Sequence, residues 1–214
     1  MTEIKGIRFI REGENKSIVP FLEPLFMDLC DADTLLNTDN NDFHKRVFVR
    51  SAFSYLDAYL YWLRLWLIGI LEKQGRISLN TDVDTIFLLK EDVPKPKVNG
   101  SLEMDKNRIP FINLCALTIR SALVANGIAP DPFFSDNGWR KMHSSIKVRH
   151  RITHPKIEND NIISEDEMFD VRESIRWFMN CIIEICNAPG KNLLDKAVAE
   201  RGERIAEIQK KPKI

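Results

Sequence analysis

The stretch of sequence that decides the fold reads Ala58-Tyr-Leu-Tyr-Trp-Leu-Arg-Leu-Trp-Leu-Ile-Gly-Ile-Leu71, and it is apolar on nearly every side of a helix. It forms the middle of residues 43–74, a segment without proline that is followed by Gly75, a residue typical of the position after a helix C-terminus. The pattern predicts one long helix that is buried on several sides, or on one side and against a subunit interface.

A membrane-spanning helix is the alternative interpretation of this segment. About 20 consecutive apolar residues are needed to cross a bilayer, and Arg50, Asp57 and Arg64 interrupt the run. We therefore expect no association with a membrane.

The same segment carries one polar stripe. Arg50, Ser54, Asp57, Tyr61 and Arg64 follow spacings of three and four residues, so they share a face of the helix. This face either meets solvent, with charge pairing among Arg50, Asp57 and Arg64, or lines a cleft beside the basic motif described below.

Composition limits the class of protein. The chain has 214 residues, 44% of them apolar, and a formal net charge of +0, so any basic surface must be local. The N-terminus shows no signal-peptide pattern. The four cysteines show no Cys-x-x-Cys spacing and are expected to be small buried side chains in a reducing cytoplasm; they are Cys30, Cys115, Cys181 and Cys186.

Further helices are predicted on both sides of the long helix. An N-terminal extension, residues 1–42, should hold one helix from Ser17, as N-cap, to about Leu36. Residues 75–108 break the helical pattern and are predicted to form an irregular insertion with a hairpin at Asn99-Gly100.

The pattern becomes helical again after the insertion. A helix over 108–126 should end at Gly127, and a second one, capped at residues 135–137, should stop at about His154, before Pro155. The capping box Ser164-Glu-Asp-Glu167 begins a strong helix that Pro189-Gly190 should end, leaving residues 189–214 as a charged helical tail.

A basic segment closes the second of these helices. Residues 137–157 contain six Lys or Arg and no Asp or Glu, and they include Lys147-Val-Arg-His-Arg-Ile-Thr-His-Pro155. Such a segment favours a phosphate-rich ligand. We expect the phosphates of such a ligand to be bound through Arg140, Lys141, Lys147, Arg151 and Lys156.

Within it, Arg149 is followed by the polar His150 and, after a short spacer, by His154. This resembles the active-site motif of HEPN domains, and the predicted helix order over residues 43–188 resembles the HEPN antiparallel helical bundle. The resemblance implies an all-α fold. It also implies a metal-independent endoribonuclease, found in toxin–antitoxin or phage-defence systems, in which two motifs meet across a homodimer.

Carried over by the resemblance, His154 takes the acid–base role, Arg149 neutralises the phosphate and His150 orients the pair. Attack of a ribose 2′-OH would leave a 2′,3′-cyclic phosphate. The residue types suit this chemistry, because histidine has an unperturbed pKa of about 6.5 and arginine offers a planar fork of donors. Five residues turn a helix by about 140°, so Arg149 and His154 should not share a face of one continuous helix.

Other interpretations remain open. Arg149 and His154 could have no role beyond hydrogen bonding to the last carbonyl groups of the helix and interacting with its dipole. Alternatively, His150 and His154 could bind a metal. The neighbouring Arg149 and Arg151 would repel a cation, so no metal or cofactor is expected. The alternatives to an enzyme are a non-catalytic HEPN module that binds RNA, a nucleotide or a partner protein, such as an antitoxin or a regulatory protein, and a helical interaction protein.

Overall fold

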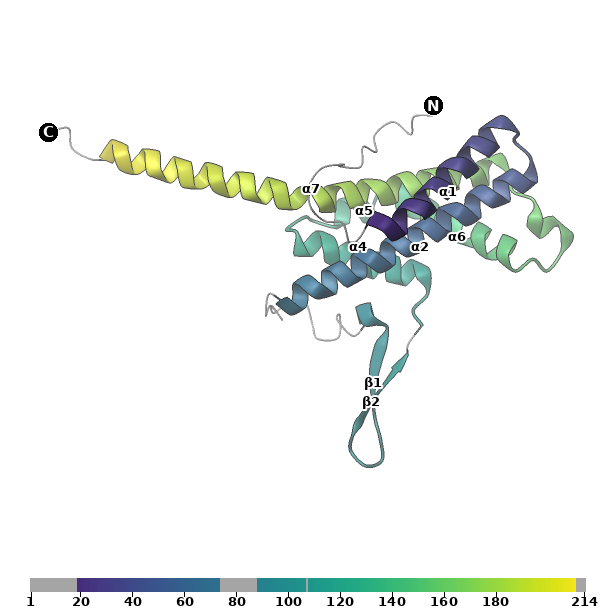
Figure 1. Ribbon diagram of the computed structural model, residues 1–214, viewed down its shortest axis with the longest axis horizontal. Coiled ribbons are helices and arrows are strands. Elements are labelled where there is room, and N and C mark those ends of the chain that lie inside the picture. The colour runs from purple at the N-terminus through teal and green to yellow at the C-terminus, as the bar shows by residue number, and fades with distance from the viewer. Residues whose placement is uncertain (1–18, 74–87, 107, 211–214) are drawn as a thin grey trace.

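The computed structural model describes residues 19–73, 88–106 and 108–210, and these form an all-α fold with one small two-stranded sheet, as the sequence predicts. Figure 1 shows the helices gathered in a bundle, from which the sheet and the last part of α7 extend. In chain order the elements are α1 (Val19–Thr38), α2 (Asp42–Lys73), β1 (Asp92–Pro96), β2 (Leu102–Lys106), α4 (Phe111–Ala125), α5 (Asp131–Phe134), α6 (Asn137–Thr153), the 3-10 helix η1 (Glu158–Asn161) and α7 (Glu165–Lys210).

Helix α2 is the predicted long helix, and it lies at the centre of the bundle. It begins after Asn41, whose side-chain oxygen accepts a hydrogen bond from the His44 backbone N–H at 2.9 Å. Helices α1, α4, α6 and α7 all contact α2. The side chains of α2 that are almost fully buried are Val49, Ala52, Phe53, Tyr55, Leu56, Leu60, Leu63 and Leu67.

One side of α2 remains open. Tyr61 is 50% exposed and Leu65 is 51% exposed, although their neighbours Leu60 and Leu63 are buried. Burial on several sides is thus confirmed. None of the helices in the described part of the chain is long and apolar enough to cross a membrane.

Helix α1 is confirmed within the N-terminal extension, although Ser17 lies outside the described residues. It pairs with α2 as a helical hairpin and contributes Leu29, Ala32 and Leu36 to the same hydrophobic core. The chain therefore forms its core from α1 as well as from residues 43–188.

Local capping signals set the ends of the later helices. Gly127, with φ +73°, follows α4, and the N–H groups of Gly127 and Ile128 donate to the carbonyls of Val124 and Leu123, as in a Schellman cap. Asp136 is the N-cap of α6 and His154 its C-cap. These ends agree with the predicted ones.

The capping box of α7 is also confirmed. The Glu167 carboxylate accepts a hydrogen bond from the Ser164 N–H at 3.0 Å, and the Ser164 hydroxyl accepts one from the Glu167 N–H at 3.2 Å. Helix α7 packs along α6 over its first half.

The predicted end of this helix at Pro189-Gly190 is wrong. Helix α7 continues without interruption to Lys210, and Figure 1 shows it leaving the bundle. A proline lacks one N–H and disfavours the helical conformation of the residue before it, but helices do continue through prolines. From residue 189 to Lys210 the tail is helical, as predicted, but it is an extension of α7 and not a separate helix.

The hairpin predicted at Asn99-Gly100 is present in the insertion, with β1 and β2 paired antiparallel. The Gly100 N–H donates to the Lys97 carbonyl and the Lys97 N–H donates to the Ser101 carbonyl. Only Gly100 has a positive φ in this loop, so the connection is a three-residue loop ending in a left-handed glycine rather than a two-residue turn.

The cysteines are free thiols. Cys115 and Cys181 are fully buried, as predicted, and burial raises the pKa of the Cys181 thiol to about 12. Cys30 is half-buried, while Cys186 is exposed, so the prediction of a buried side chain is wrong for Cys186.

The close approach of α6 and α7 at Gly138 gives a stability test. A methyl group on Gly138 would overlap the Cβ of Trp177 and lie 2.9 Å from the Asp136 carboxylate. Gly138→Ala should therefore destabilise the protein by about 1–3 kcal/mol in denaturant unfolding. Gly69→Ala is the matched control, because nothing lies within 4 Å of its added methyl group and alanine favours a helix. Equal stability of the two variants would contradict this packing.

Candidate active site and basic face of α6

The exposed face of α6 is cationic and rich in histidine. Arg140, His143, Lys147 and His150 follow spacings of three and four residues and are all exposed. His154, the C-cap residue, follows with the same spacing and is also exposed. We call these five residues the α6 basic face.

His154 marks the point where the backbone leaves the helix. Its N–H donates to the His150 carbonyl at 3.0 Å, and its φ of −131° and ψ of 62° lie outside the helical region. Pro155 imposes this change, because it disfavours the helical conformation of the residue before it. Across the described ranges, the His154 side chain has no hydrogen bond or ion pair, so it is accessible to a ligand.

Arg149 lies on the other side of α6 and faces the bundle, as its place after Met142 and Ile146 predicts. Its Nη2 donates to Asp57 Oδ2 of α2 at 2.8 Å. The guanidinium carbon also lies 5.6 Å from the ring centre of Phe53 and 5.8 Å from that of Phe111. A cation over two aromatic faces and beside a carboxylate is held in one orientation.

This ion pair remains at the surface. The side chain of Arg149 is 29% exposed and that of Asp57 is 43% exposed. Burial raises the pKa of Asp57 above its ordinary value, and the nearby Arg149 and Arg64 oppose that increase. The guanidinium has five N–H donors, so the bond to Asp57 leaves others for a phosphate oxygen.

The polar stripe of α2 thus meets α6 at two points. Arg50 Nη2 donates to the Ile152 carbonyl at 2.9 Å, and Asp57 binds Arg149. Arg64 instead donates to Glu91 at 2.8 Å and to the Leu89 carbonyl at 3.3 Å. The stripe lies beside the basic motif, and Asp57 is paired with α6 and not with Arg50 or Arg64.

The residues predicted to bind RNA divide into two groups. Arg140, Lys147 and Lys156 are exposed. Lys141 Nζ is 2.5 Å from Asp170 of α7, and Arg151 is bound by Glu167. The first group is open to a ligand, while the second group contributes to the packing of α6 against α7.

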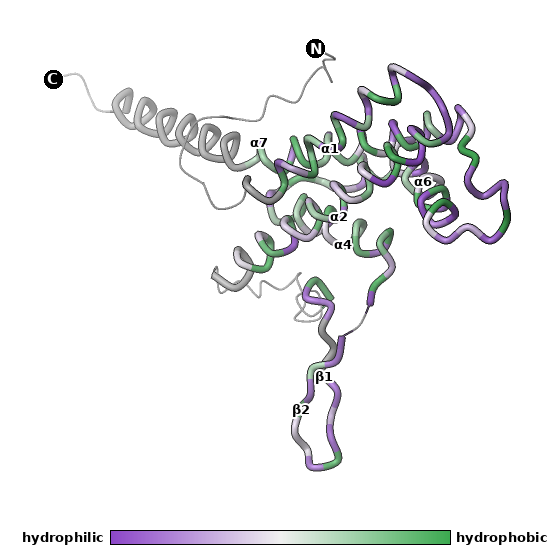
Figure 2. The backbone as a smooth tube through the Cα atoms, turned by 45° about the vertical axis from the view of Figure 1, so that its right-hand side comes forward, coloured by the Kyte–Doolittle hydropathy of each residue, from purple (hydrophilic) through white to green (hydrophobic). Residues whose placement is uncertain are grey.

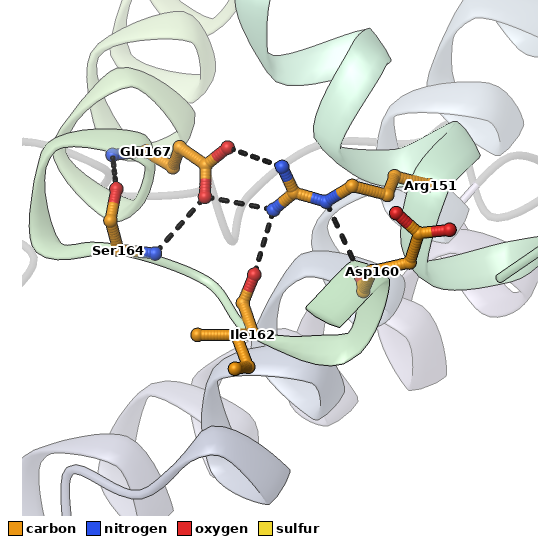
Figure 3. A network of polar contacts seen from close by, with 5 residues as sticks. All are labelled: Arg151, Asp160, Ile162, Ser164 and Glu167. Carbon is orange, nitrogen blue, oxygen red and sulfur yellow. Dashed lines mark hydrogen bonds and ion pairs between the residues drawn. The ribbon is translucent and has the colours of Figure 1, made fainter. Parts of the chain in front are cut away.

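Arg151 organises the loop that follows α6, as Figure 3 shows. Its Nη1 and Nη2 each donate to a Glu167 oxygen at 2.8 Å. It also donates to the Ile162 carbonyl at 2.8 Å and to the Asp160 carbonyl at 3.3 Å. The side chain therefore ties residues 160–162 to the start of α7 and fixes the loop that begins at His154.

Asp57 is the residue of this site whose role the sequence did not reveal. It belongs to the polar stripe, but its partner Arg149 lies 92 residues away in the chain. A single carboxylate in the apolar middle of α2 is the signal that could have pointed to a cationic partner on another helix.

Among the residues that the structure describes, no three His, Cys, Asp or Glu side chains gather where they could hold a metal ion. In that part of the chain, His150 and His154 therefore do not form a three-residue metal site with another His, Cys, Asp or Glu.

Comparison of the chain with protein-family models, with curated proteins and with solved structures gives no match in any of the three.

The Arg151–Glu167 pair predicts a specific pH dependence of stability. Hydrogen bonds from Arg151 hold the pKa of Glu167 below its ordinary value. A carboxylate whose pKa is lower in the folded state stabilises the protein above its unfolded pKa, about 4.3, and this stabilisation is lost as pH falls through the folded pKa. Glu167→Gln should lower the free energy of unfolding by about 1–2 kcal/mol at pH 7 and by less at pH 3, since the loss sets in as pH falls below the unfolded pKa of about 4.3.

Glu173→Gln provides the control for urea unfolding at both pH values. Glu173 pairs with Arg176 on the surface of α7, where Arg176 is 66% exposed, so its change should cost under about 0.5 kcal/mol. An effect of Glu167→Gln that stays constant from pH 7 to pH 3 would contradict the proposed linkage.

Proposed function

We propose that this protein is a metal-independent endoribonuclease of the HEPN type that works in the cytoplasm, in a toxin–antitoxin or phage-defence setting. The observation that supports it best is the end of α6. There an exposed His154 completes the α6 basic face, one turn beyond Arg149, which is held at the surface by Asp57. This arrangement offers a general acid–base group and a phosphate ligand without a metal.

In this proposal His154 accepts the proton of a ribose 2′-OH as that oxygen bonds to the adjacent phosphorus, and the P–O5′ bond breaks as the leaving 5′-oxygen takes up a proton from water. Negative charge grows on the phosphoryl oxygens, and the remaining N–H donors of Arg149 stabilise it. His150, exposed one turn before His154, orients the pair, and Asp57 fixes the guanidinium. The product is a 2′,3′-cyclic phosphate and a 5′-hydroxyl.

The proposed enzyme is a homodimer. Arg149 and His154 lie on different sides of α6, and no hydrogen bond joins their side chains, both of which the structure describes. Tyr61 and Leu65 are exposed on α2, and Tyr61 lies one turn from Asp57. An apolar contact there would place the two Arg149–Asp57 pairs of a dimer near each other, so that each His154 could act with the Arg149 of the other chain.

A second candidate function rests on the same ion pair. Asp57 already neutralises much of the Arg149 charge, which favours a non-catalytic module that binds RNA, a nucleotide or a partner protein, such as an antitoxin or a regulatory protein. The two candidates differ in whether bound RNA is cleaved.

The role of His154 is tested by the rate of RNA cleavage in EDTA. Loss of a positioned acid–base group costs about 10² to 10⁴ in rate, so His154→Ala should cleave at least about 100-fold more slowly while its helical CD signal and its affinity for RNA stay unchanged. Arg149→Ala should weaken both cleavage and binding, since Arg149 meets phosphate.

His143→Ala is the matched control for the cleavage assay. His143 is exposed on the same face of α6 but lies away from its C-terminal end, so its loss should leave the cleavage rate at saturating RNA unchanged. Equal slowing by both histidine variants, or cleavage by His154→Ala at the parent rate, would remove the catalytic role. RNA that is bound and never cleaved by the parent protein would favour the binding module.

The salt dependence of RNA binding should come mainly from the exposed cations, which are Arg140 and Lys147 of the α6 basic face and Lys156 just beyond it. For single strands, log affinity falls with log salt by about 0.7 for each neutralised phosphate. Replacing Arg140, Lys147 and Lys156 by Ala together should therefore reduce this slope by about 2. Lys141→Ala should leave the slope nearly unchanged, because Lys141 is bound to Asp170. Fluorescence anisotropy with labelled single-stranded RNA measures both, and equal slopes for the parent and the triple variant would contradict the assignment.

A further inference from the structure

The β1–β2 hairpin stands away from the helical bundle, and its base is firmly held. Figures 1 and 2 both show it extending from the bundle. At its base Leu89 is 1% exposed and packs with Leu67 and Ile68 of α2. Arg64 of α2 donates to both Glu91 and the Leu89 carbonyl. A fixed base presents the hairpin as an arm with a defined direction.

The two outer edges of this hairpin differ. Pro94 pairs with Met104 and Pro96 pairs with Leu102. The Lys97 N–H donates to the Ser101 carbonyl, and hydrogen-bonded and non-hydrogen-bonded pairs alternate along an antiparallel ladder. The backbone groups at positions 94 and 96 of β1, and at Leu102 and Met104 of β2, therefore point away from the hairpin.

This register closes one edge and leaves the other open. The outward positions of β1 are 92, 94 and 96, and proline has no N–H, so only Asp92 at the base of the hairpin keeps an outward donor, which disfavours the addition of a further strand. On β2 the outward N–H and C=O groups belong to Leu102 and Met104, which do have donors. A further strand fits best at the β2 edge.

The side chains of β2 define what such a strand must carry. On one face Leu102 is 71% exposed and Met104 is 49% exposed. On the other face Glu103 and Asp105 pair with Lys97 and with Lys95, yet their side chains stay 60% and 49% exposed. The residues of an added strand beside β2 would thus face apolar side chains on one face and carboxylates on the other.

The charges disfavour a second copy of β2 as the occupant in the registers that pair most of the strand. Two copies of β2 paired antiparallel about Met104 would place the Glu103 carboxylate of one copy opposite the Asp105 carboxylate of the other. Registers centred on Glu103 or Asp105 place identical carboxylates opposite each other. Like charges directly opposite in a sheet are destabilising.

We propose that the β2 edge binds an extended segment of a partner protein, in which Lys or Arg alternates with apolar residues. The segment adds a third strand to the hairpin through the backbone of Leu102 and Met104. Its apolar residues cover Leu102 and Met104, and its cationic residues meet Glu103 and Asp105. This is recognition by strand addition, in which the backbone gives affinity and alternate side chains give specificity, and it is independent of the proposed cleavage of RNA.

The test uses the full chain and a nine-residue peptide, blocked at both ends, in which lysine alternates with valine. Titration followed by ¹H–¹⁵N NMR should shift the amide signals of β2 more than those of the helices. The peptide with glutamate in place of lysine should bind at least about tenfold more weakly, because its carboxylates would face Glu103 and Asp105.

Three variants separate the backbone from the side chains. Met104→Pro removes the backbone N–H that points outward from β2, so that position 104 lacks a donor as its partner Pro94 does. This change should lower the affinity for the lysine peptide by about tenfold or more. Met104→Ala keeps that donor and should cost about threefold. Glu103→Gln should also cost about threefold and reduce the dependence on salt, and it decides the outcome if the proline variant disrupts the hairpin.

Equal binding by Met104→Pro and the parent, with the hairpin signals preserved, would overturn the proposal. Equal affinity for the lysine and glutamate peptides would overturn the assigned partner chemistry. Shifts confined to the helices, self-association through β2 or the absence of binding at millimolar peptide would each overturn the proposal as well.

Discussion

The burial of α2 against α1, α4, α6 and α7 is the interaction on which the rest of the structure depends. Residues such as Val49, Leu56 and Leu63 are almost completely removed from water, and each fully buried aliphatic side chain contributes about 1.5–3 kcal/mol. The same helix carries Asp57 among these apolar side chains. The ion pair of Asp57 with Arg149 therefore holds the Arg149 guanidinium, which we propose binds phosphate, in a fixed position near the end of α6.

The packing of α6 also divides its charges between two tasks. Of the cations in residues 137–157, Lys141, Arg149 and Arg151 bind carboxylates of neighbouring helices. The exposed Arg140 and Lys147 remain on the α6 basic face, where no acidic residue of α6 offsets them. A segment that looks uniformly basic in sequence therefore stabilises the bundle on one side and carries exposed cations, the proposed RNA-binding surface, on the other.

Features that depend on neighbouring residues were predictable from the sequence. The ends of α6 and the start of α7 follow from Asp136, Pro155 and the Ser164–Glu167 capping box, because caps act within one turn. The Asp57–Arg149 pair depends on how two distant helices pack, so no local pattern reveals it. The prediction that α7 ends at Pro189 was wrong, because a proline weakens a helix at one position without determining whether the helix ends there.

The proposed function requires that the end of α6 cleaves RNA through its own side chains by attack of the 2′-OH. The most direct measurement is end-group analysis of RNA incubated with the purified parent protein in EDTA, by mass spectrometry of the fragments. Attack by the 2′-OH leaves 2′,3′-cyclic phosphate and 5′-hydroxyl ends, and these are the expected result. Fragments with 3′-hydroxyl and 5′-phosphate ends, or cleavage that stops when EDTA is added, would contradict it.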